Sequence, residues 1–174
     1  VSSPIVLYNI PGRSVVDLST ETTAQICDKA PNVVGLKDAT GNVLRCQELK
    51  KRLGDRLTVL SGDDALTLAF GSVGAAGVIS VTSNVKPREV SAVTTALLAN
   101  DYVKARALHF ALVELHNVMF IEPNPAPAKA ALASLGKMTD VVRLPLVSAS
   151  PATKQKVADA LARVNETFPQ LIAS

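Results

Sequence analysis

"VVGLKDATGN", residues 33–42, joins a short apolar run to the start of a helix. The run contains no polar residue before Lys37, which is typical of a strand covered on both faces in a parallel sheet. Asn42 is a favourable N-cap residue, and Gly54 is a common residue at a helix C-terminus. The stretch therefore predicts a strand followed by a helix from about Asn42 to Leu53, which is one unit of an α/β fold.

The same plan recurs through the first eighty residues. Three further short apolar runs are "PIVLYN" (4–9), "LTVLSG" (57–62) and "AAGVIS" (75–80). A helix is predicted from Ser19 or Thr20 to before Pro31, and another from Asp63 and Asp64, whose carboxylates suit a helix N-terminus, to near Gly71. The expected order is βαβαβαβ, with right-handed crossovers.

From residue 81 the pattern predicts helices alone. Pro87 suits a first helical position, and a proline-rich passage, "EPNPAPAK" (122–129), precedes a short helix through Leu135 and Gly136. Three helices carry apolar residues at helical spacing. Their predicted buried faces are Val90, Val93, Leu97 and Leu98; Ala105, Leu108, Leu112, Leu115 and Met119; and Val157, Leu161, Val164 and Phe168.

Four strand–helix units are half of an eightfold barrel, which takes about 250 residues in its complete form. An open doubly wound sheet is the alternative, but no glycine-rich phosphate turn follows any of the four runs. The chain also opens almost directly in a strand and without a methionine. We therefore expect residues 1–98 to be the second half of a (β/α)8 TIM barrel and residues 99–174 to be a C-terminal helical region, both parts of a larger protein.

Composition excludes several classes of protein. The 174 residues are 48% hydrophobic, enough for a core, and 18 Lys plus Arg against 15 Asp plus Glu give a dispersed net charge of +3. The dispersed charge and the low aromatic content, 3%, do not suggest a nucleic-acid surface. No apolar run approaches the roughly 18 residues of a membrane span. Two cysteines without a CxxC pattern indicate reduced thiols and a cytoplasmic protein.

Every predicted strand ends in groups that can contact a ligand. In sheets of this type the ligand lies beyond the carboxyl ends of the strands. The groups there are Tyr8 and Asn9; Lys37; Ser61 and Gly62; and Ile79 and Ser80.

Lys37 is the most informative of these residues. Burial lowers the pKa of an amine, and a neutral amine attacks carbonyl carbon to form a Schiff base. The alternative is that Lys37 pairs with Asp38 or reaches water. Tyr8 could donate and accept a proton beside that amine, or be an ordinary tyrosine bonded to backbone. Arg13 offers a planar fork to a carboxylate, or is a solvated loop arginine.

Other polar groups favour structural interpretations. Gly62 permits close backbone approach, and Asp63 and Asp64 are expected to cap a helix. His109 and His116 are seven residues apart, roughly 10 Å along a helix, which is too far for one metal ion, so we expect them to be structural. No cofactor motif is present.

Several motifs, in order, resemble the dihydrodipicolinate synthase family of the N-acetylneuraminate lyase superfamily, whose members use pyruvate as a Schiff base. The matching stretches are "LYNIPGRS", "VVGLKDATGN", "LSGDDA", "GAAGVISVTSNV", "NPAPAKAAL" and "RLPL". They span nearly all of the chain.

The resemblance implies roles for particular residues. Lys37 would form the imine with pyruvate, and Tyr8 would relay protons beside it. Arg13 would engage the carboxylate of aspartate semialdehyde, while the backbone at Ile79, with Gly62 near it, would line the pyruvate pocket. The implied activity is that of a lyase, 4-hydroxy-tetrahydrodipicolinate synthase, in the diaminopimelate route to lysine. It needs neither cofactor nor metal.

The chain departs from the family at its start, because the first four strand–helix units are absent. We therefore expect it to be inactive without an N-terminal half-barrel, and to act in a cytoplasmic homo-oligomer, a dimer or a tetramer. Two alternatives stay open. One is another pyruvate-dependent class I aldolase, similar to N-acetylneuraminate lyase; the other is a non-catalytic half-barrel with an assembly or regulatory role.

Overall fold

The chain folds into two compact units, one up to Ser80 and one from Val81 onward. The computed structural model describes residues 2–173. The boundary predicted at residue 98 is the end of the half-barrel, which is a different kind of boundary from that between two compact units. It stays a prediction.

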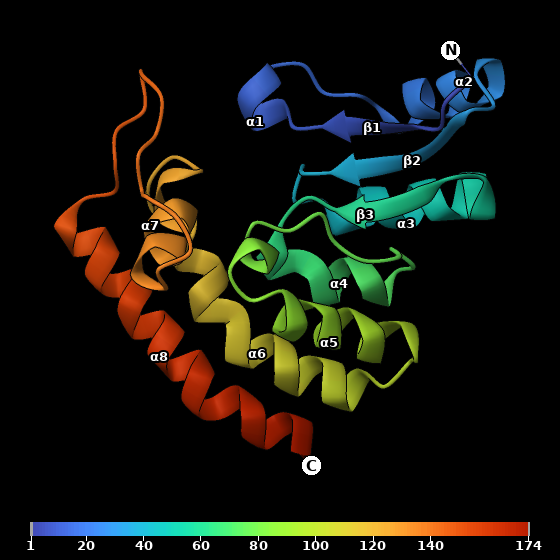
Figure 1. Cartoon of the computed structure of the whole chain (residues 1–174). Coiled ribbons are helices and arrows are strands. Elements are labelled where there is room, and N and C mark those ends of the chain that lie inside the picture. The colour runs from blue at the N-terminus through green and yellow to red at the C-terminus, as the bar shows by residue number, and fades with distance from the viewer. Residues whose placement is uncertain (1, 174) are drawn as a thin grey trace. The chain divides into compact units, whose positions relative to one another are not determined.

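The first unit contains a parallel sheet of three strands, β1 (Ile5–Asn9), β2 (Val33–Asp38) and β3 (Thr58–Ser61), in the order β1-β2-β3 (Figure 1). Tyr8 lies opposite Lys37 in the register of β1 and β2, and Lys37 lies opposite Leu60 in that of β2 and β3. The three strands run in the same direction, so their carboxyl ends share one edge. An α/β fold with three of the predicted strands is therefore confirmed.

The fourth predicted strand is largely wrong. Residues 75–80 run beside β3 but form a single bridge, between Ser61 and Val78. Ser61 N donates to Gly77 O at 2.8 Å, and Ile79 N donates to Ser61 O at 2.9 Å. The φ of Gly77, within this stretch, is 150°, a value that other residues rarely adopt.

In the first unit, two helices begin directly after their predicted capping residues, the third predicted helix begins as a 3-10 turn, and one further short helix was not predicted. The helices are α1 (Pro11–Ser14), α2 (Thr20–Lys29), α3 (Val43–Leu53) and α4 (Thr67–Ser72), with short 3-10 segments η1 (Gly54–Arg56) and η2 (Asp64–Leu66). The side chains of Ser19, Asn42 and Asp63 accept the backbone N–H of Thr22, Arg45 and Ala65 at 3.0, 3.2 and 3.0 Å. Asp64 differs from the expectation, because it is buried and accepts a hydrogen bond from Ser80 Oγ.

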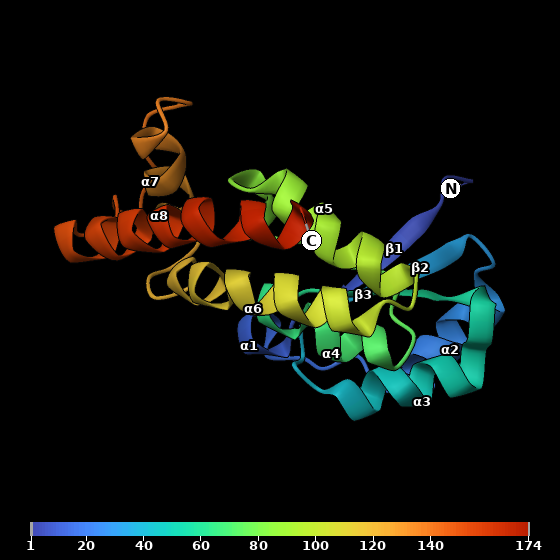
Figure 2. The ribbon, with the colours of Figure 1, turned by 90° about the horizontal axis from the view of Figure 1, so that it is seen from below.

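Only one face of the sheet is covered within this unit. Helices α2 and α3 lie on the same side of it (Figure 2), and the core there joins Leu36 and Val59 to residues of the helices. The helix residues of this core are Ala24, Cys27, Cys46, Leu49, Leu53 and Phe70. On the opposite face, Val6 and Tyr8 keep 49% and 52% of their surface exposed. Alternate residues of a strand point to opposite faces, so the sheet has one packed and one open side.

Both cysteines belong to the packed side. Cys27 and Cys46 are free thiols and both are buried. Burial raises the pKa of the Cys46 thiol to about 11 and raises that of Cys27 as well. They are therefore small apolar core residues rather than reactive nucleophiles.

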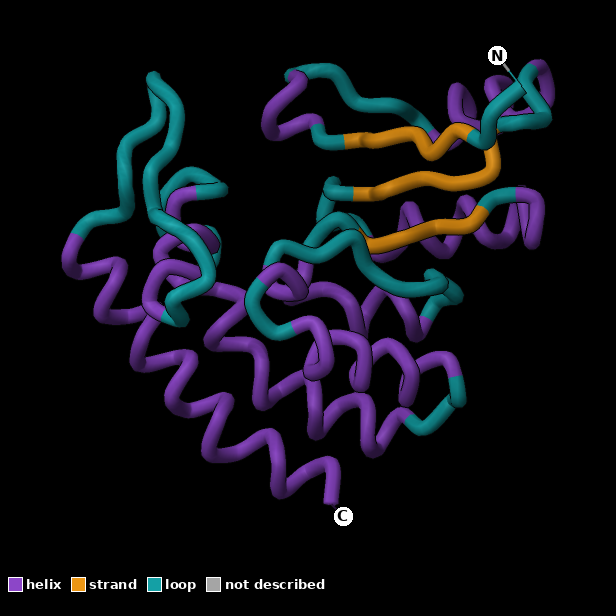
Figure 3. The backbone as a smooth tube through the Cα atoms, viewed as in Figure 1, coloured by secondary structure: helices purple, strands orange, loops and turns teal. Residues whose placement is uncertain are grey.

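The regular elements of the second unit, in the residues that the structure describes, are all helices, as predicted, and loops join them (Figure 3). Its elements are η3 (Thr82–Asn84), α5 (Pro87–Leu98), α6 (Tyr102–Val118), α7 (Ala126–Ser134) and α8 (Pro151–Ala173). Helix α6 packs against α5 and α8, and α7 packs against α8. The predicted buried faces are confirmed except at Leu98, which is 61% exposed. Leu98 follows Leu97 by 100° around α5, and it is Ala96 that completes the buried stripe.

The two histidines of α6 are closer than their spacing suggests. His109 and His116 are buried, and their ring centroids are 5.6 Å apart. His116 Nδ1 shares a 2.8 Å hydrogen bond with Thr82 Oγ1. The separation of about 10 Å therefore holds for the backbone but not for the rings. Among the described residues, no group of three or more His, Cys, Asp or Glu side chains could hold a metal ion.

No helix in residues 2–173 is both long enough and apolar enough to cross a membrane.

Candidate active site

Lys37 and Tyr8 contact one another on the open face of the sheet. They are paired in the register of β1 and β2, so their side chains leave the sheet on the same side. Lys37 Nζ lies 4.0 Å from the centroid of the Tyr8 ring. The lysine is half-buried and the tyrosine is about half exposed. An amine and a phenol thus stand side by side where a small molecule can reach both.

Asp38 does not pair with Lys37, so that part of the alternative is wrong; Lys37 is partly exposed, and its contact with water stays open. As the next residue of β2, Asp38 points to the packed face and is fully buried. Its Oδ2 atom lies 3.2 Å from Arg45 Nε, an ion pair without the alignment of a hydrogen bond. Its Oδ1 atom accepts hydrogen bonds from Thr40 N and Thr40 Oγ1 at 2.9 and 2.6 Å. These partners leave the lysine free of the adjacent carboxylate.

Arg13 lies on α1, the single helical turn that follows the arrowhead of β1 (Figure 1). It is exposed, and in the part of the chain that the structure describes it has no ion-pair partner. Its guanidinium is therefore available to an anionic ligand at the carboxyl edge of the sheet.

Gly62 and Ile79 both lie at the end of β3. A Cβ atom on Gly62 would come within 2.7 Å of Ala39 Cβ and 3.0 Å of Asp38 O, to which the Gly62 amide donates at 2.7 Å. Gly62 thus allows a close approach of Ala39 to the backbone. The Ile79 amide is bonded to Ser61 O, so a ligand contact by this backbone would use the carbonyl oxygen. The substrate-binding roles of both residues stay predictions.

The model of the dihydrodipicolinate synthetase family matches residues 1–164. The chain belongs to this family. A curated relative, 4-hydroxy-tetrahydrodipicolinate synthase from Sorangium cellulosum (strain So ce56), is 69% identical over 164 residues, which cover 94% of this chain and 54% of that protein. The chain thus spans about half the length of the curated relatives it matches.

Solved structures of the dihydrodipicolinate synthetase family superpose closely on this chain. The 4-hydroxy-tetrahydrodipicolinate synthase of Methylacidiphilum fumariolicum SolV has a TM-score of 0.96 and 43% identity, over 99% of this chain and 58% of that one. Chloride-inhibited dihydrodipicolinate synthase from Acinetobacter baumannii, complexed with pyruvate, has a TM-score of 0.91 and 39% identity, over 95% of this chain and 56% of that one.

In this family member, substitution of Gly62 by alanine is expected to lower the free energy of unfolding by about 1 to 3 kcal/mol, because the added methyl group meets Ala39 and the backbone of Asp38. Chemical denaturation measures this change. Gly12→Ala is the matched control, since a Cβ atom at Gly12 meets nothing within 4 Å. Equal free energies of unfolding for the two variants would contradict the prediction, because the backbone at Ala39 would then move aside without loss of stability.

Reasoning from the sequence missed a polar network on the packed side of the site. Asn9 Nδ2 donates to Asp17 Oδ1 at 2.8 Å, and Asn9 Oδ1 accepts from Leu18 N at 3.1 Å. Arg45 Nη1 lies 3.4 Å from Asp17 Oδ2. One signal was available, because Arg45 stands four residues before Leu49 and eight before Leu53, on the buried stripe of α3. An arginine on such a stripe requires a buried acidic partner.

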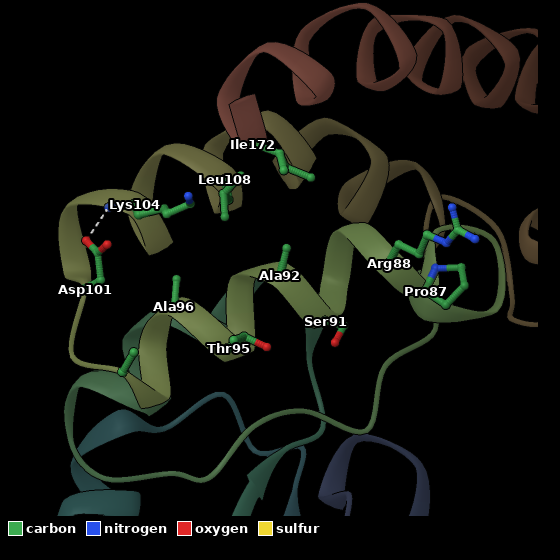
Figure 4. A pocket seen from close by; sticks show the side chains of 11 residues that line it. Pro87, Arg88, Ser91, Ala92, Thr95, Ala96, Asp101, Lys104, Leu108 and Ile172 are labelled. Carbon is green, nitrogen blue, oxygen red and sulfur yellow. Dashed lines mark hydrogen bonds between the residues drawn. The ribbon is translucent and has the colours of Figure 1, made fainter. Parts of the chain in front are cut away.

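The second unit has a groove of about 660 Å³ between α5, α6 and the end of α8 (Figure 4). Its floor includes Ala92, Ala96 and Leu108, and Arg88 and Lys104 lie at opposite ends. Asp101 caps α6 there by accepting the Lys104 amide at 3.0 Å. None of the predicted site residues lines this groove.

Proposed function

We propose that this chain is the second half of the (β/α)8 barrel of a 4-hydroxy-tetrahydrodipicolinate synthase, which condenses pyruvate with aspartate semialdehyde. The observation that carries the proposal is the contact of Lys37 Nζ with Tyr8 at the carboxyl edge of a parallel sheet. The family, and a relative complexed with pyruvate, support this reading. Lys37 and Tyr8 are the proposed catalytic residues, and Arg13, Gly62 and Ile79 the proposed substrate-binding ones.

The first half of the reaction would take place at Lys37. Its neutral amine attacks the ketone carbon of pyruvate, and the resulting carbinolamine loses one water to give an imine. Tyr8 can carry protons in these steps, because a phenol both donates and accepts. Loss of a proton from the methyl group then converts the imine to an enamine. The lysine nitrogen serves as the electron sink, so the sequence of steps is complete without a cofactor.

In the second half, the enamine carbon attacks the aldehyde carbon of aspartate semialdehyde and forms the new carbon–carbon bond. The amino group of the semialdehyde then attacks the imine carbon, which closes the ring and releases the Lys37 amine. The balance is one pyruvate and one semialdehyde to one 4-hydroxy-tetrahydrodipicolinate and one water. Arg13 would hold the carboxylate of the semialdehyde by paired hydrogen bonds.

We infer that the site requires an N-terminal half-barrel as its partner. Val6 and Tyr8 are about half exposed on the open face of the sheet, and the chain covers only 54% of the length of its relative from Sorangium cellulosum. In a closed barrel the strand faces that point inward are filled by layers of side chains. The missing half would therefore cover Val6, exclude water near Lys37 and supply the rest of the pyruvate site.

Borohydride trapping tests the proposal. The protein for the test is a chimera, in which the N-terminal part of the Sorangium cellulosum relative precedes this chain. Reduction in the presence of pyruvate is expected to add a stable mass at Lys37, and the chimera should turn over aspartate semialdehyde. Trapping with turnover of sugar aldehydes instead would indicate another class I aldolase. Absence of trapping would favour a non-catalytic half-barrel.

A further prediction concerns Arg13. Arg13→Ala in the chimera is expected to lower kcat/KM for aspartate semialdehyde by roughly 30- to 1,000-fold, as the loss of a charged hydrogen-bond partner does, while pyruvate trapping continues. Steady-state kinetics at saturating pyruvate give the first value and mass spectrometry the second. Arg56→Ala is the control, because Arg56 is an exposed arginine that pairs with Asp28. An equal effect of both variants would contradict the assigned role.

The assembly and location belong to the same proposal. We expect the complete protein to form a homodimer or homotetramer. The cytoplasm is its expected compartment, where the unpaired thiols Cys27 and Cys46 stay reduced.

A further inference from the structure

In the segment that carries Arg13, Leu18 packs against the apolar core, whereas residues 10–16 do not belong to it. In residues 10–18, Val15 and Val16 are 91% and 73% exposed. The described hydrogen bonds of residues 10–16 are local, such as Ser14 Oγ to Ile10 O at 3.0 Å and Val15 N to Pro11 O at 2.9 Å. Residues 10–16 must therefore be fixed relative to the sheet through the ends of the segment.

Leu18 is one such end, because it packs against the core and its amide donates to Asn9 Oδ1 at 3.1 Å. Asp17 makes the other long-range contacts there. Its carboxylate accepts from Asn9 at the end of β1 and lies 3.4 Å from Arg45 Nη1 on α3. Arg45 is only 8% exposed and is held on its other side by the fully buried Asp38, the residue that follows Lys37. One guanidinium thus bridges the strand end that carries Lys37 and the segment that carries Arg13.

We propose that Asp17 and Arg45 are positioning residues that tether residues 10–18 to the sheet, and that this tether sets the place of Arg13 relative to Lys37. The inference rests on the proposed function, because Arg13 is the proposed anchor of the second substrate. Burial makes the Asp38–Arg45 pair a rigid support, since neither charge can move to water without cost. Asp17 is 55% exposed and is the end of the tether that can be released.

Asp17→Ala is the informative variant. Removing Arg45 would leave Asp38 buried without its ionic partner, and such variants are expected to unfold. Asp17→Ala keeps that pair and removes only the tether. Asp28→Ala is a matched control, because Asp28 is 61% exposed and pairs with Arg56 at the same sequence separation, 28 residues.

Two measurements test the tether. In the chimera, Asp17→Ala is expected to raise KM for aspartate semialdehyde about 10- to 100-fold, as misplacement of a binding group does, with the rate of pyruvate trapping within about twofold of the parent. In the 174-residue chain, hydrogen exchange in residues 10–18 is expected to quicken in Asp17→Ala and not in Asp28→Ala.

Each outcome supports or overturns the inference. A KM within about twofold of the parent, or exchange unchanged in residues 10–18, overturns it. The inference is also overturned if Asp17→Ala slows pyruvate trapping, raises KM and lowers thermal stability together, because this combination indicates a general loss of folding. If the parent chimera fails to trap pyruvate, the proposed function fails. Faster exchange in Asp17→Ala alone then still supports the tether, and unchanged exchange refutes it.

Discussion

Replacement of Lys37 by arginine in the chimera is expected to abolish borohydride trapping of pyruvate and to lower kcat/KM by about a thousandfold or more. Arginine keeps the positive charge and much of the length beside Tyr8, but it does not lose a proton in proteins and cannot form an imine. The result would separate nucleophilic chemistry at Lys37 from simple attraction of a carboxylate by a cation. Intact-mass and peptide-mass measurements after reduction give the readout.

Lys51→Arg is the control for this substitution, because Lys51 is an exposed lysine on α3. It is expected to trap pyruvate as the parent does. A pyruvate adduct on any other lysine of the Lys37→Arg variant would contradict the assignment, as would substantial turnover by that variant.

Tyr8→Phe is expected to lower kcat by about 10²- to 10⁴-fold. The substitution removes the hydroxyl group that would carry protons and keeps the ring whose centroid lies 4.0 Å from Lys37 Nζ. The fall should therefore report proton transfer rather than loss of packing. Slow trapping of pyruvate should persist, because the amine is intact, and single-turnover trapping rates measure it.

The chain has one other tyrosine, and it provides the control. Tyr102 is the first residue of α6 and is 41% exposed. Tyr102→Phe should leave both kcat and trapping unchanged. A kcat for Tyr8→Phe within about threefold of the parent would falsify the proton-relay role.

Local signals predicted much of the fold. Ser19, Asn42 and Asp63 each cap the helix that the sequence assigned to them, because the cap depends on a side chain and an amide two or three residues away. The three strands followed from short apolar runs between these helices. Lys37 and Tyr8 could be placed near each other because the ends of neighbouring parallel strands share an edge.

Features set by tertiary geometry could not be predicted in the same way. Residues 75–80 have the composition of a strand, but they form only the bridge to Ser61. Leu98 is apolar and near the buried stripe of α5, yet its position around the helix leaves it exposed. The ring centroids of His109 and His116 lie 5.6 Å apart, a distance that the spacing of seven residues does not determine.

The candidate site was predicted only on its open side. The alternative that Lys37 pairs with Asp38 failed because residues adjacent in a strand point to opposite faces of the sheet. Asp38 instead belongs with Arg45 and Thr40 on the packed face. That network joins segments 28 residues apart, from Asp17 to Arg45, and no local pattern records such a pairing.

In the second half of β2, odd-numbered and even-numbered residues point to opposite faces of the sheet. Lys37 stands at an odd-numbered place with Gly35, and Asp38 at an even-numbered place with Leu36. Val34 lies beside the register shift between Ile5 and Val6 and is outside this alternation. Loss of Leu36 would shift both residues by one place, moving the Lys37 ammonium to the packed face and the Asp38 carboxylate to the open face. This part of the strand should therefore tolerate substitutions far more readily than insertions or deletions.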